Sequence, residues 1–276
     1  MKFEIISASE VSLADQAAAF NAAFAGYVGG NFELNAATLA SFISLQGIDL
    51  TYSRFARDEH GQLVSFGFIN KTGSVSRLAG MGTIAAARRS GVAAAILSQL
   101  LAEAKERSES VMVLEVIEQN PPALKLYESA GFTRVTRLLG WRGSSDDAHA
   151  AQVKSRELSM FEALQTPTTP EYPALPWPVC RFSAAKVRGA KAFGLEDTAI
   201  VLGDTDVSPI RLHAFFGLDG TNWESVRNLT ASVLRRFPGR EFYAPPIFPE
   251  EFAAPLFTPL GFRKEQLSQF FMRKDV

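Results

Sequence analysis

The sequence predicts an α+β protein (an α/β mixed sheet) whose central sheet is flanked by helices. A short apolar segment at 80–84 is followed by a basic turn and then by helical periodicity over 92–104, which indicates a strand–turn–helix unit. The run 111–117 is almost continuously apolar, as in a strand covered on both faces. Segments 50–56 and 62–70 are joined by a short polar turn and read as a β-hairpin.

The other N-terminal elements follow from local patterns. Residues 3–7 are expected to form a first strand, and 76–84 is expected to form the strand before the basic turn. The alanine-rich segment 12–27 places Leu13, Ala17, Phe20 and Phe24 on one side, which predicts a helix. A second, shorter helix is expected over 36–46.

Composition and charge narrow the class of protein. With 276 residues and 47% hydrophobic content, the chain can form one large domain or two small ones. Its formal net charge of -1 gives no general attraction to nucleic acid or anionic lipid. The single Cys180 excludes an intrachain disulfide, and three dispersed histidines do not match zinc-ligand spacing. The charged start and the lack of a long apolar run predict a cytoplasmic protein without a membrane partner. Together with the net charge and the Cys and His spacing, they predict no nucleic-acid partner and no metal.

The basic turn before residue 92 has the features of an anion site. A helix begins with unpaired backbone N–H groups at a positive dipole end, so it attracts phosphate. Small residues at Gly91 and Ala93 let a diphosphate approach those amides, and Arg88 and Arg89 add charged donors at the rim. A P-loop ending and the third glycine of a dinucleotide fingerprint are both missing. An ordinary strand–helix turn with solvated arginines is the alternative.

The segment 120–132 predicts a short helix that carries a phenol. Pro121 and Pro122 suit the first turn of a helix, where a missing N–H costs nothing. Gly131 is placed to end the helix in a left-handed conformation. Tyr127 shares one face of this helix with Ala123, and its phenol has a proton that it can give.

At these residues the chain resembles the GNAT superfamily of acyl-CoA N-acyltransferases. The family motif that binds the pyrophosphate of CoA is matched by Arg88, Gly91 and Ala93. Its second motif is matched by a set on the following helix: Asn120, Ala123, Leu126, Tyr127, Gly131 and Phe132. The resemblance covers 1–142 and implies a GNAT fold with a mostly antiparallel mixed central sheet. Ala85 and Ala93 depart from the family, which often has proline and glycine there.

The resemblance also implies a binding site for acetyl-CoA as co-substrate, without a metal. Tyr127 would protonate the departing thiolate, and the amides of 83–85 would polarise the acyl oxygen. The residues expected to bind the cofactor come from the turn and the second motif: Thr83, Ile84, Ala85, Arg88, Arg89, Ser90, Gly91, Val92, Ala93, Asn120, Ala123 and Tyr127.

Glu115 is the candidate for the base that deprotonates the acceptor amine. It lies inside the apolar strand, and a carboxylate withdrawn from water holds a proton more readily than a solvated one. An outward-facing side chain or a pair with an arginine is the alternative. Glu118 and Glu33 are further candidates.

The C-terminal half predicts a connector and a second copy of the fold. Proline recurs in 143–180, which suggests a Pro-rich connector. The segment 256–262 aligns with 126–132 at an offset of 130, so 181–276 is expected to be a degenerate GNAT-like domain. The copy should be catalytically silent because the site residues are replaced at that offset: Arg88 by Leu218, Gly91 by Thr221, Ala93 by Trp223 and Tyr127 by Phe257.

The function predicted from the sequence is direct transfer of an acetyl group from acetyl-CoA to a primary amine of a small molecule or peptide. Two alternatives stay open. One is a non-catalytic acyl-CoA-binding sensor or scaffold, and the other is an acyltransferase of the same fold that uses a longer acyl-CoA. The sequence does not distinguish a monomer from a homodimer, because a tandem pair can mimic a dimer within one chain.

Overall fold

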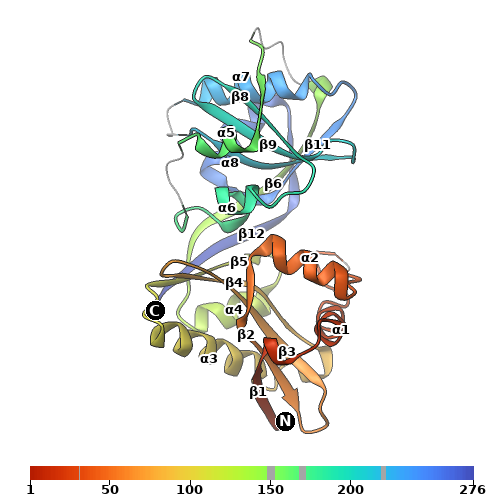
Figure 1. The fold of residues 1–276 in the computed structure, drawn as a ribbon, viewed down its shortest axis with the longest axis vertical. Helices are drawn as coiled ribbons and strands as arrows, with labels where there is room; N and C mark the ends of the chain where they lie inside the picture. The colour runs from red at the N-terminus through yellow and green to blue at the C-terminus, as the bar shows by residue number, and fades with distance from the viewer. Residues whose placement is uncertain (31, 148–152, 168–171, 219–221) are drawn as a thin grey trace. The chain divides into compact units, whose positions relative to one another are not determined.

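The structure is a computed structural model that describes residues 1–30, 32–147, 153–167, 172–218 and 222–276. The chain divides into two compact units (Figure 1). Unit 1 comprises Met1–Val135 together with Phe271–Val276, and unit 2 comprises Thr136–Phe270. The end of the chain therefore belongs to the N-terminal unit. None of the helices in the described ranges is long and apolar enough to cross a bilayer.

Unit 1 is an α+β unit with a mixed, mostly antiparallel sheet, as the sequence predicts. Strands β1 to β4 pair antiparallel in series, and β4 pairs with β5 in parallel. The strand order is β1-β2-β3-β4-β5-β12-β6. The elements are β1 (Phe3–Ser7), α1 (Leu13–Ala23), α2 (Ala36–Gln46), β2 (Ile48–Asp58), β3 (Leu63–Thr72), β4 (Val75–Thr83), α3 (Val92–Glu106), β5 (Val111–Ile117), α4 (Pro121–Ser129), the start of β6 (Thr133–Ser144) and the end of β12 (Arg263–Asp275).

Helix α3 packs on the sheet because its apolar residues form one stripe. Ile96 and Leu100 are fully buried, and a Cβ added at Gly67 of β3 would lie 2.7 Å from Leu100 Cδ1. Glycine at position 67 therefore permits the close approach of helix and sheet. Helix α1 is shorter than predicted, since it ends at Ala23 and Gly26 follows with φ +68°.

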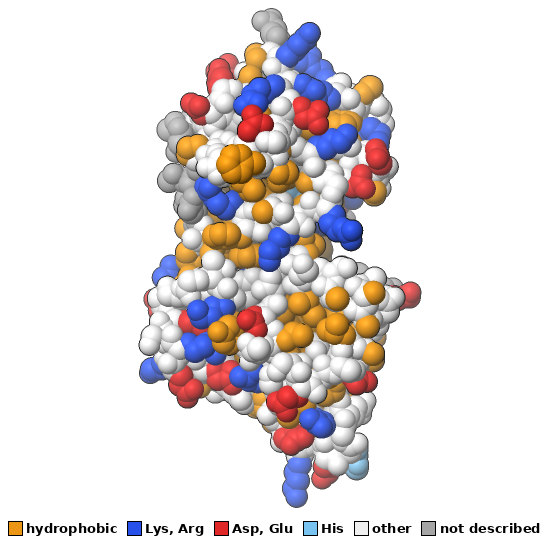
Figure 2. Space-filling view, in the orientation of Figure 1, with side chains coloured by type: hydrophobic (Ala, Val, Ile, Leu, Met, Phe, Trp, Pro, Cys, Tyr) orange, Lys and Arg blue, Asp and Glu red, His pale blue; other side chains and the backbone are white. Residues whose placement is uncertain are grey.

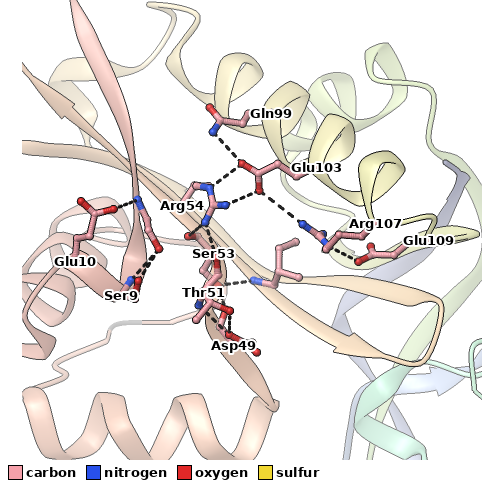
Figure 3. A network of polar contacts seen from close by, with 12 residues as sticks. Ser9, Glu10, Asp49, Thr51, Ser53, Arg54, Gln99, Glu103, Arg107 and Glu109 are labelled. Carbon is pink, nitrogen blue, oxygen red and sulfur yellow. Dashed lines mark hydrogen bonds and ion pairs between the residues drawn. The ribbon is translucent and has the colours of Figure 1, made fainter.

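A polar network ties α3 to the sheet of unit 1 (Figure 3). Arg54 of β2 pairs with Glu103 of α3 at 2.8 Å, and Arg107 pairs with Glu109 at 2.6 Å. The carboxylate of Glu109 is fully buried and also accepts a hydrogen bond from Ser76 of β4. The buried Glu109 carboxylate is thus bonded on both sides, as a buried charge requires. We assign this network to stability.

Unit 2 repeats the order of unit 1, which confirms the predicted second GNAT-like copy. Strand β10 pairs with β11 in parallel, as β4 does with β5, and the pairs β9–β10, β8–β9 and β7–β8 are antiparallel. The strand order is β12-β6-β11-β10-β9-β8-β7. The elements besides β6 and β12 are β7 (Arg156–Leu158), α5 (Met160–Gln165), α6 (Arg181–Ala184), β8 (Ala190–Leu195), β9 (Thr198–Asp204), β10 (Ile210–Phe216), α7 (Trp223–Leu234), β11 (Glu241–Pro249) and α8 (Glu250–Phe257).

The segment 143–180 differs from the predicted connector. It contains the end of β6, strand β7 and helix α5, and Ala163 of α5 is fully buried. Strand β7 pairs with β8, so this part of the segment belongs to unit 2. Strand β7 has only three residues, which are too few to show a period, and the prolines of this segment favoured the interpretation as a connector. Residues 148–152 and 168–171 of the predicted connector lie outside the described residues.

Candidate active site

The two central strands of unit 1, β4 and β5, separate from each other in the middle of the sheet. β4 and β5 pair from Val75–Val111 to Leu78–Leu114, and no pair follows. At this point β4 has a bulge, because Ile69 of β3 pairs with Leu78 and Phe68 pairs with Gly80. Ala79 is the extra residue. Beyond the bulge, the edge of β4 that faces β5 leaves backbone groups available to a ligand.

The start of α3 offers uncapped amides at the carboxyl end of β4. The N-cap residue Gly91 has φ +87°, and no side chain caps the helix. The hydroxyl of Ser90 bonds the carbonyl of Ala87 at 2.7 Å instead. A Cβ added at Gly91 would meet no atom within 4 Å, so space is open in front of these amides. The predicted residues Val92 and Ala93 begin this helix, and the site fits the diphosphate of CoA.

The two arginines of the turn, Arg88 and Arg89, directly precede the start of α3. Both are exposed, and Arg89 has a left-handed backbone with φ +64°. Arg88 donates at 3.3 Å to the carbonyl of Thr83 from Nε and to the carbonyl of Ala23 from Nη2. Both bonds are long and therefore weak, so the guanidinium can turn toward an anion at low cost.

The end of β4 is less available than the sequence suggests. The amide of Ile84 donates to the carbonyl of Val64 at 3.0 Å, and the hydroxyls of Thr83 and Ser65 are 2.8 Å apart. The Ile84 amide is therefore occupied, and the expectation that it would polarise the acyl oxygen needs correction. Ala85 starts a 3-10 turn after Ile84. The β4 edge from the bulge at Ala79 onward offers backbone groups closer to the parting of the strands.

Helix α4 follows β5 and carries the second motif. Asn120 is its N-cap residue, and its Oδ1 accepts from the amide of Ala123 at 3.4 Å. Tyr127 is only 8% exposed. Burial raises the pKa of Tyr127 above its ordinary value, and the neighbouring Tyr27 raises it further. The Tyr127 phenol therefore keeps its proton at neutral pH.

Tyr27 joins the site from the segment after α1, and the sequence did not indicate it. Its side chain hydrogen-bonds that of Asn120, which partly offsets the rise in the pKa of Tyr27 caused by burial. A Cβ added at Gly29 would lie 2.8 Å from Ile117 Cδ1, so this segment rests on the end of β5. A tyrosine in a glycine-rich loop gives no pattern that identifies a contact so distant in sequence.

Glu115 pairs with an arginine, which is one of the two alternatives to a free base. Its Oε2 accepts from Nε and Nη2 of Arg77 at 2.8 and 2.7 Å. The Arg77 side chain also donates to Gln46 Oε1 at 2.9 Å. The Glu115 and Arg77 side chains are 6% and 5% exposed. Oε1 of Glu115 is buried and has no hydrogen-bond partner in the described part of the chain.

Aromatic rings gather between α1 and α2 beside this site. Phe20 is within 5.5 Å of Phe24, Phe32 and Phe42 between ring centroids, and Phe24 is 4.9 Å from Tyr27. Phe24, Phe32 and Phe42 are only half-buried. Figure 2 shows hydrophobic side chains gathered over α2. An apolar surface thus adjoins the ring of Tyr27.

A hollow on unit 1 lies away from these residues. A cavity of about 550 Å³ lies between α1 and the turn of the β2–β3 hairpin, and its lining includes Asp15, Ala19 and Arg57. It contains none of the motif residues. The start of α3, in contrast, is an open surface, since a Cβ added at Gly91 would meet no atom within 4 Å.

The comparisons with known proteins agree with this geometry. Residues 22–132 match the model of the acetyltransferase (GNAT) family. No curated protein matches the sequence. A GCN5-related N-acetyltransferase from Sphaerobacter thermophilus is similar in structure, with a TM-score of 0.64, 11% identity and coverage of 99% of this chain and 95% of that chain.

Two further solved structures resemble the whole chain. A tandem GNAT protein from the clavulanic acid biosynthesis pathway has a TM-score of 0.62 and 13% identity, and the match covers 99% of this chain and 98% of that one. The glucosamine N-acetyltransferase region of a fungal multi-domain GH3 β-N-acetylglucosaminidase has a TM-score of 0.71 and 11% identity, over 99% of this chain and 38% of that chain. Such low identities show the fold alone.

Unit 1 therefore contains the part of the chain, residues 22–132, that matches the GNAT family model. The chain as a whole has a tandem GNAT fold, with a degenerate second GNAT-like unit.

Within unit 1, the two motifs lie where the parallel strands end. Gly91 follows β4 and Tyr127 follows β5, so the carboxyl ends of both strands contribute. Ligand sites of mixed sheets form at such ends. The sequence-based prediction did not include three features of the site: Tyr27, Arg77 and the bulge at Ala79. The charge of Arg77 within a strand was a readable signal, whereas the bulge left none.

Proposed function

We propose that this chain is an N-acetyltransferase that moves an acetyl group from acetyl-CoA to a primary amine of a small molecule or peptide by direct transfer. The uncapped start of α3 behind Gly91 carries the proposal, because it offers several amides and two arginines to a diphosphate. The residues proposed to bind CoA are Thr83, Ala85, Arg88, Arg89, Ser90, Gly91, Val92, Ala93, Asn120, Ala123 and Tyr127, with the backbone of Ala79 and Gly80 added.

The chain's own groups suit the proton movements of such a transfer. A lysine-like amine is neutral in only about one of 10³ to 10⁴ molecules at pH 7, so a group that draws off its proton raises the rate. Acetyl-CoA supplies the acyl group as a thioester. Tyr127 keeps its proton at neutral pH and can donate a hydrogen bond where a thiolate develops. We propose Tyr127 as the acid.

Glu115 is proposed as the group that receives the ammonium proton or holds the acceptor. Its paired oxygen is committed to Arg77, which leaves Oε1 for an incoming N–H donor. A buried oxygen without a partner is costly, and a donor from the acceptor amine would satisfy it. The half-buried rings of Phe24, Phe32 and Phe42 favour an acceptor with an apolar part.

Release of free thiol tests the function. The full chain is incubated with acetyl-CoA and a panel of primary amines, with and without an apolar substituent. Thiol release that depends on the amine supports the transferase. Tight CoA binding with no release by any amine would identify a sensor or scaffold instead. Faster release from succinyl- or myristoyl-CoA than from acetyl-CoA would identify an enzyme that uses a longer acyl group.

Replacing Tyr127 by Phe tests the acid. We expect kcat to fall by roughly 10²-fold or more with little change in the KM for acetyl-CoA, because only a proton donor is removed. Tyr52→Phe on β2 is the matched control, since Tyr52 stacks under Arg107 in the stability network and should leave kcat unchanged. An unaltered rate for Tyr127→Phe would remove Tyr127 from the mechanism.

A further inference from the structure

The two units carry an arginine at the same place in their sheets. Arg77 of β4 pairs in register with Val113 of β5, and Arg211 of β10 pairs in register with Tyr243 of β11. Both strand pairs are parallel. Val113 and Tyr243 stand at the offset of 130 that relates the two copies. Arg211 is therefore the counterpart of Arg77.

The surroundings of the two arginines differ in charge. Arg77 is neutralised by Glu115 at 2.7 Å. The residue at the same offset from Glu115 is Pro245, which has no side-chain acceptor. Arg211 is exposed, and within the described ranges it has no ion pair or side-chain hydrogen bond. The second copy has kept the guanidinium and lost its counter-ion.

A row of polar side chains continues from Arg211 across unit 2. Arg142 of β6 pairs in register with Tyr243, and its guanidinium carbon is 4.9 Å from the centre of the Tyr243 ring. Arg142 Nε donates to Glu265 at 2.6 Å. Arg211 and Arg142 carry two positive charges and Glu265 carries one negative charge, so the row has one positive charge in excess.

Neutral hydrogen-bonding groups flank that charge. Burial, and then the charge of Arg211, lower the pKa of His213 to about 4, so its imidazole is neutral at pH 7. Burial raises the pKa of Tyr243, so its phenol keeps its proton. A Cβ added at Gly203 of β9 would lie 3.1 Å from His213 Nε2 and 3.5 Å from the Cβ of Arg211, so the imidazole of His213 lies over this glycine, beside Arg211.

We propose that Arg211, Tyr243 and Arg142 form a binding site for a small oxyanion, a carboxylate or phosphate group, in unit 2. The planar fork of Arg211 matches two oxygens of such a group. The Tyr243 hydroxyl and the neutral His213 supply further hydrogen bonds without adding charge. The ligand would pair with Arg211 in unit 2 as Glu115 pairs with Arg77 in unit 1. The site uses no residue proposed for CoA, so the degenerate unit gains a function of its own.

Calorimetry on the full chain tests this site. CoA is added to saturation to cover the amides of α3, and inorganic phosphate and citrate are titrated in separate experiments. We expect one equivalent of at least one probe to bind, and Arg211→Gln to weaken it about tenfold or more. Arg211→Lys keeps the charge but loses the fork, so it should bind with intermediate affinity. Arg156→Gln is the control, because Arg156 is an exposed arginine of the same unit, paired with Glu162.

Several results would overturn the proposal. One is the absence of binding by both probes. Another is equal weakening by Arg211→Gln and Arg156→Gln, which would mean that only net charge matters. A third is loss of binding in Arg88→Gln with Arg211→Gln unaffected, which would place the ion in unit 1. Anion binding in calorimetry does not depend on acetyl transfer. Failure of the proposed enzyme activity would therefore neither support nor overturn the anion site in unit 2.

Discussion

Glu115 shows how one neighbour changes the meaning of a residue. As a carboxylate in an apolar strand it is a candidate base, but the structure places it against Arg77 at 2.7 Å. Breaking a buried ion pair by removing one partner costs about 3–5 kcal/mol, because the other charge stays buried. A structural role and a role in proton transfer therefore predict different consequences of the same substitution.

Glu115→Gln separates the two roles. It keeps the shape and an acceptor for Arg77, so we expect the free energy of unfolding to fall by roughly 1–3 kcal/mol. If Glu115 also receives the proton, the acidic limb of the pH profile of kcat/KM should disappear. Gln46→Leu, which removes another partner of Arg77, is the control and should lower stability while keeping that limb. A Glu115→Gln enzyme with an intact acidic limb would leave Glu115 a structural role only.

His213 predicts how stability depends on pH. Its folded-state pKa is about 4, below the ordinary value of 6.5, because burial disfavours the charged form. The unfolded chain therefore binds more protons between these values, and the contribution of His213 to stability is lost as pH falls from about 6.5 toward 4. The slope is at most about 1.4 kcal/mol per pH unit.

Urea denaturation of the full chain at pH 7 and pH 4.5 measures this effect. The loss of stability on acidification should be smaller for His213→Asn than for the natural sequence. His60→Asn should change nothing, since His60 lies exposed in a turn. Identical losses for His213→Asn and the natural sequence would show that His213 does not titrate in this window.

At the scale of elements, the start of α3 decides whether unit 1 can hold a diphosphate. Gly91→Ala should lower the free energy of unfolding by about 1–2 kcal/mol, since a Cβ at φ +87° is strained. It should also raise the KM for acetyl-CoA, because the Cβ enters the open space before the amides.

Gly61→Ala is a matched control for that prediction. Gly61 has φ +83°, and a Cβ there also meets nothing within 4 Å, but it lies in the turn of the β2–β3 hairpin. Unfolding monitored by circular dichroism should show a similar loss for both variants, and steady-state kinetics should show a raised KM for Gly91→Ala alone. An equal KM in both variants would move CoA binding away from α3.

Elements with a strong local signal were predicted well. Helix α2 has the predicted bounds 36–46, α3 begins at the predicted residue 92, and β5 spans the predicted 111–117. The bounds of α2 follow from its two caps. The side chain of Asn35 accepts hydrogen bonds from two amides of the first turn, and Gly47 ends the helix with φ +64°. Strand β7 and helix α5 were missed because each is too short to show a period.

At the scale of the whole molecule, one CoA site per chain is expected. In unit 2 the helix that matches α3 is α7. The counterpart of Ala93 is Trp223, whose ring centroid lies 5.6 Å from that of Phe252. The counterpart of Tyr127 is Phe257, which is fully buried in the core of that unit. Leu218 replaces Arg88, and the counterpart of Gly91, Thr221, lies outside the described residues.

Calorimetry with CoA counts the sites. One equivalent per chain is the expected result, and Gly91→Val should abolish it, because both strain and bulk then oppose the diphosphate. Two equivalents in the natural chain, or one that survives Gly91→Val, would show that unit 2 binds CoA.

The sequence by itself determined the fold class, the two motifs and the repeat, because these depend on local periodicity, turn residues and a constant offset of 130. Only the tertiary structure decided that Glu115 faces Arg77, that Tyr27 reaches Asn120 and that Arg211 has lost its counter-ion. It also assigned the last six residues of the chain to unit 1. Contacts between residues far apart in sequence depend on strand register and packing, which no local pattern encodes.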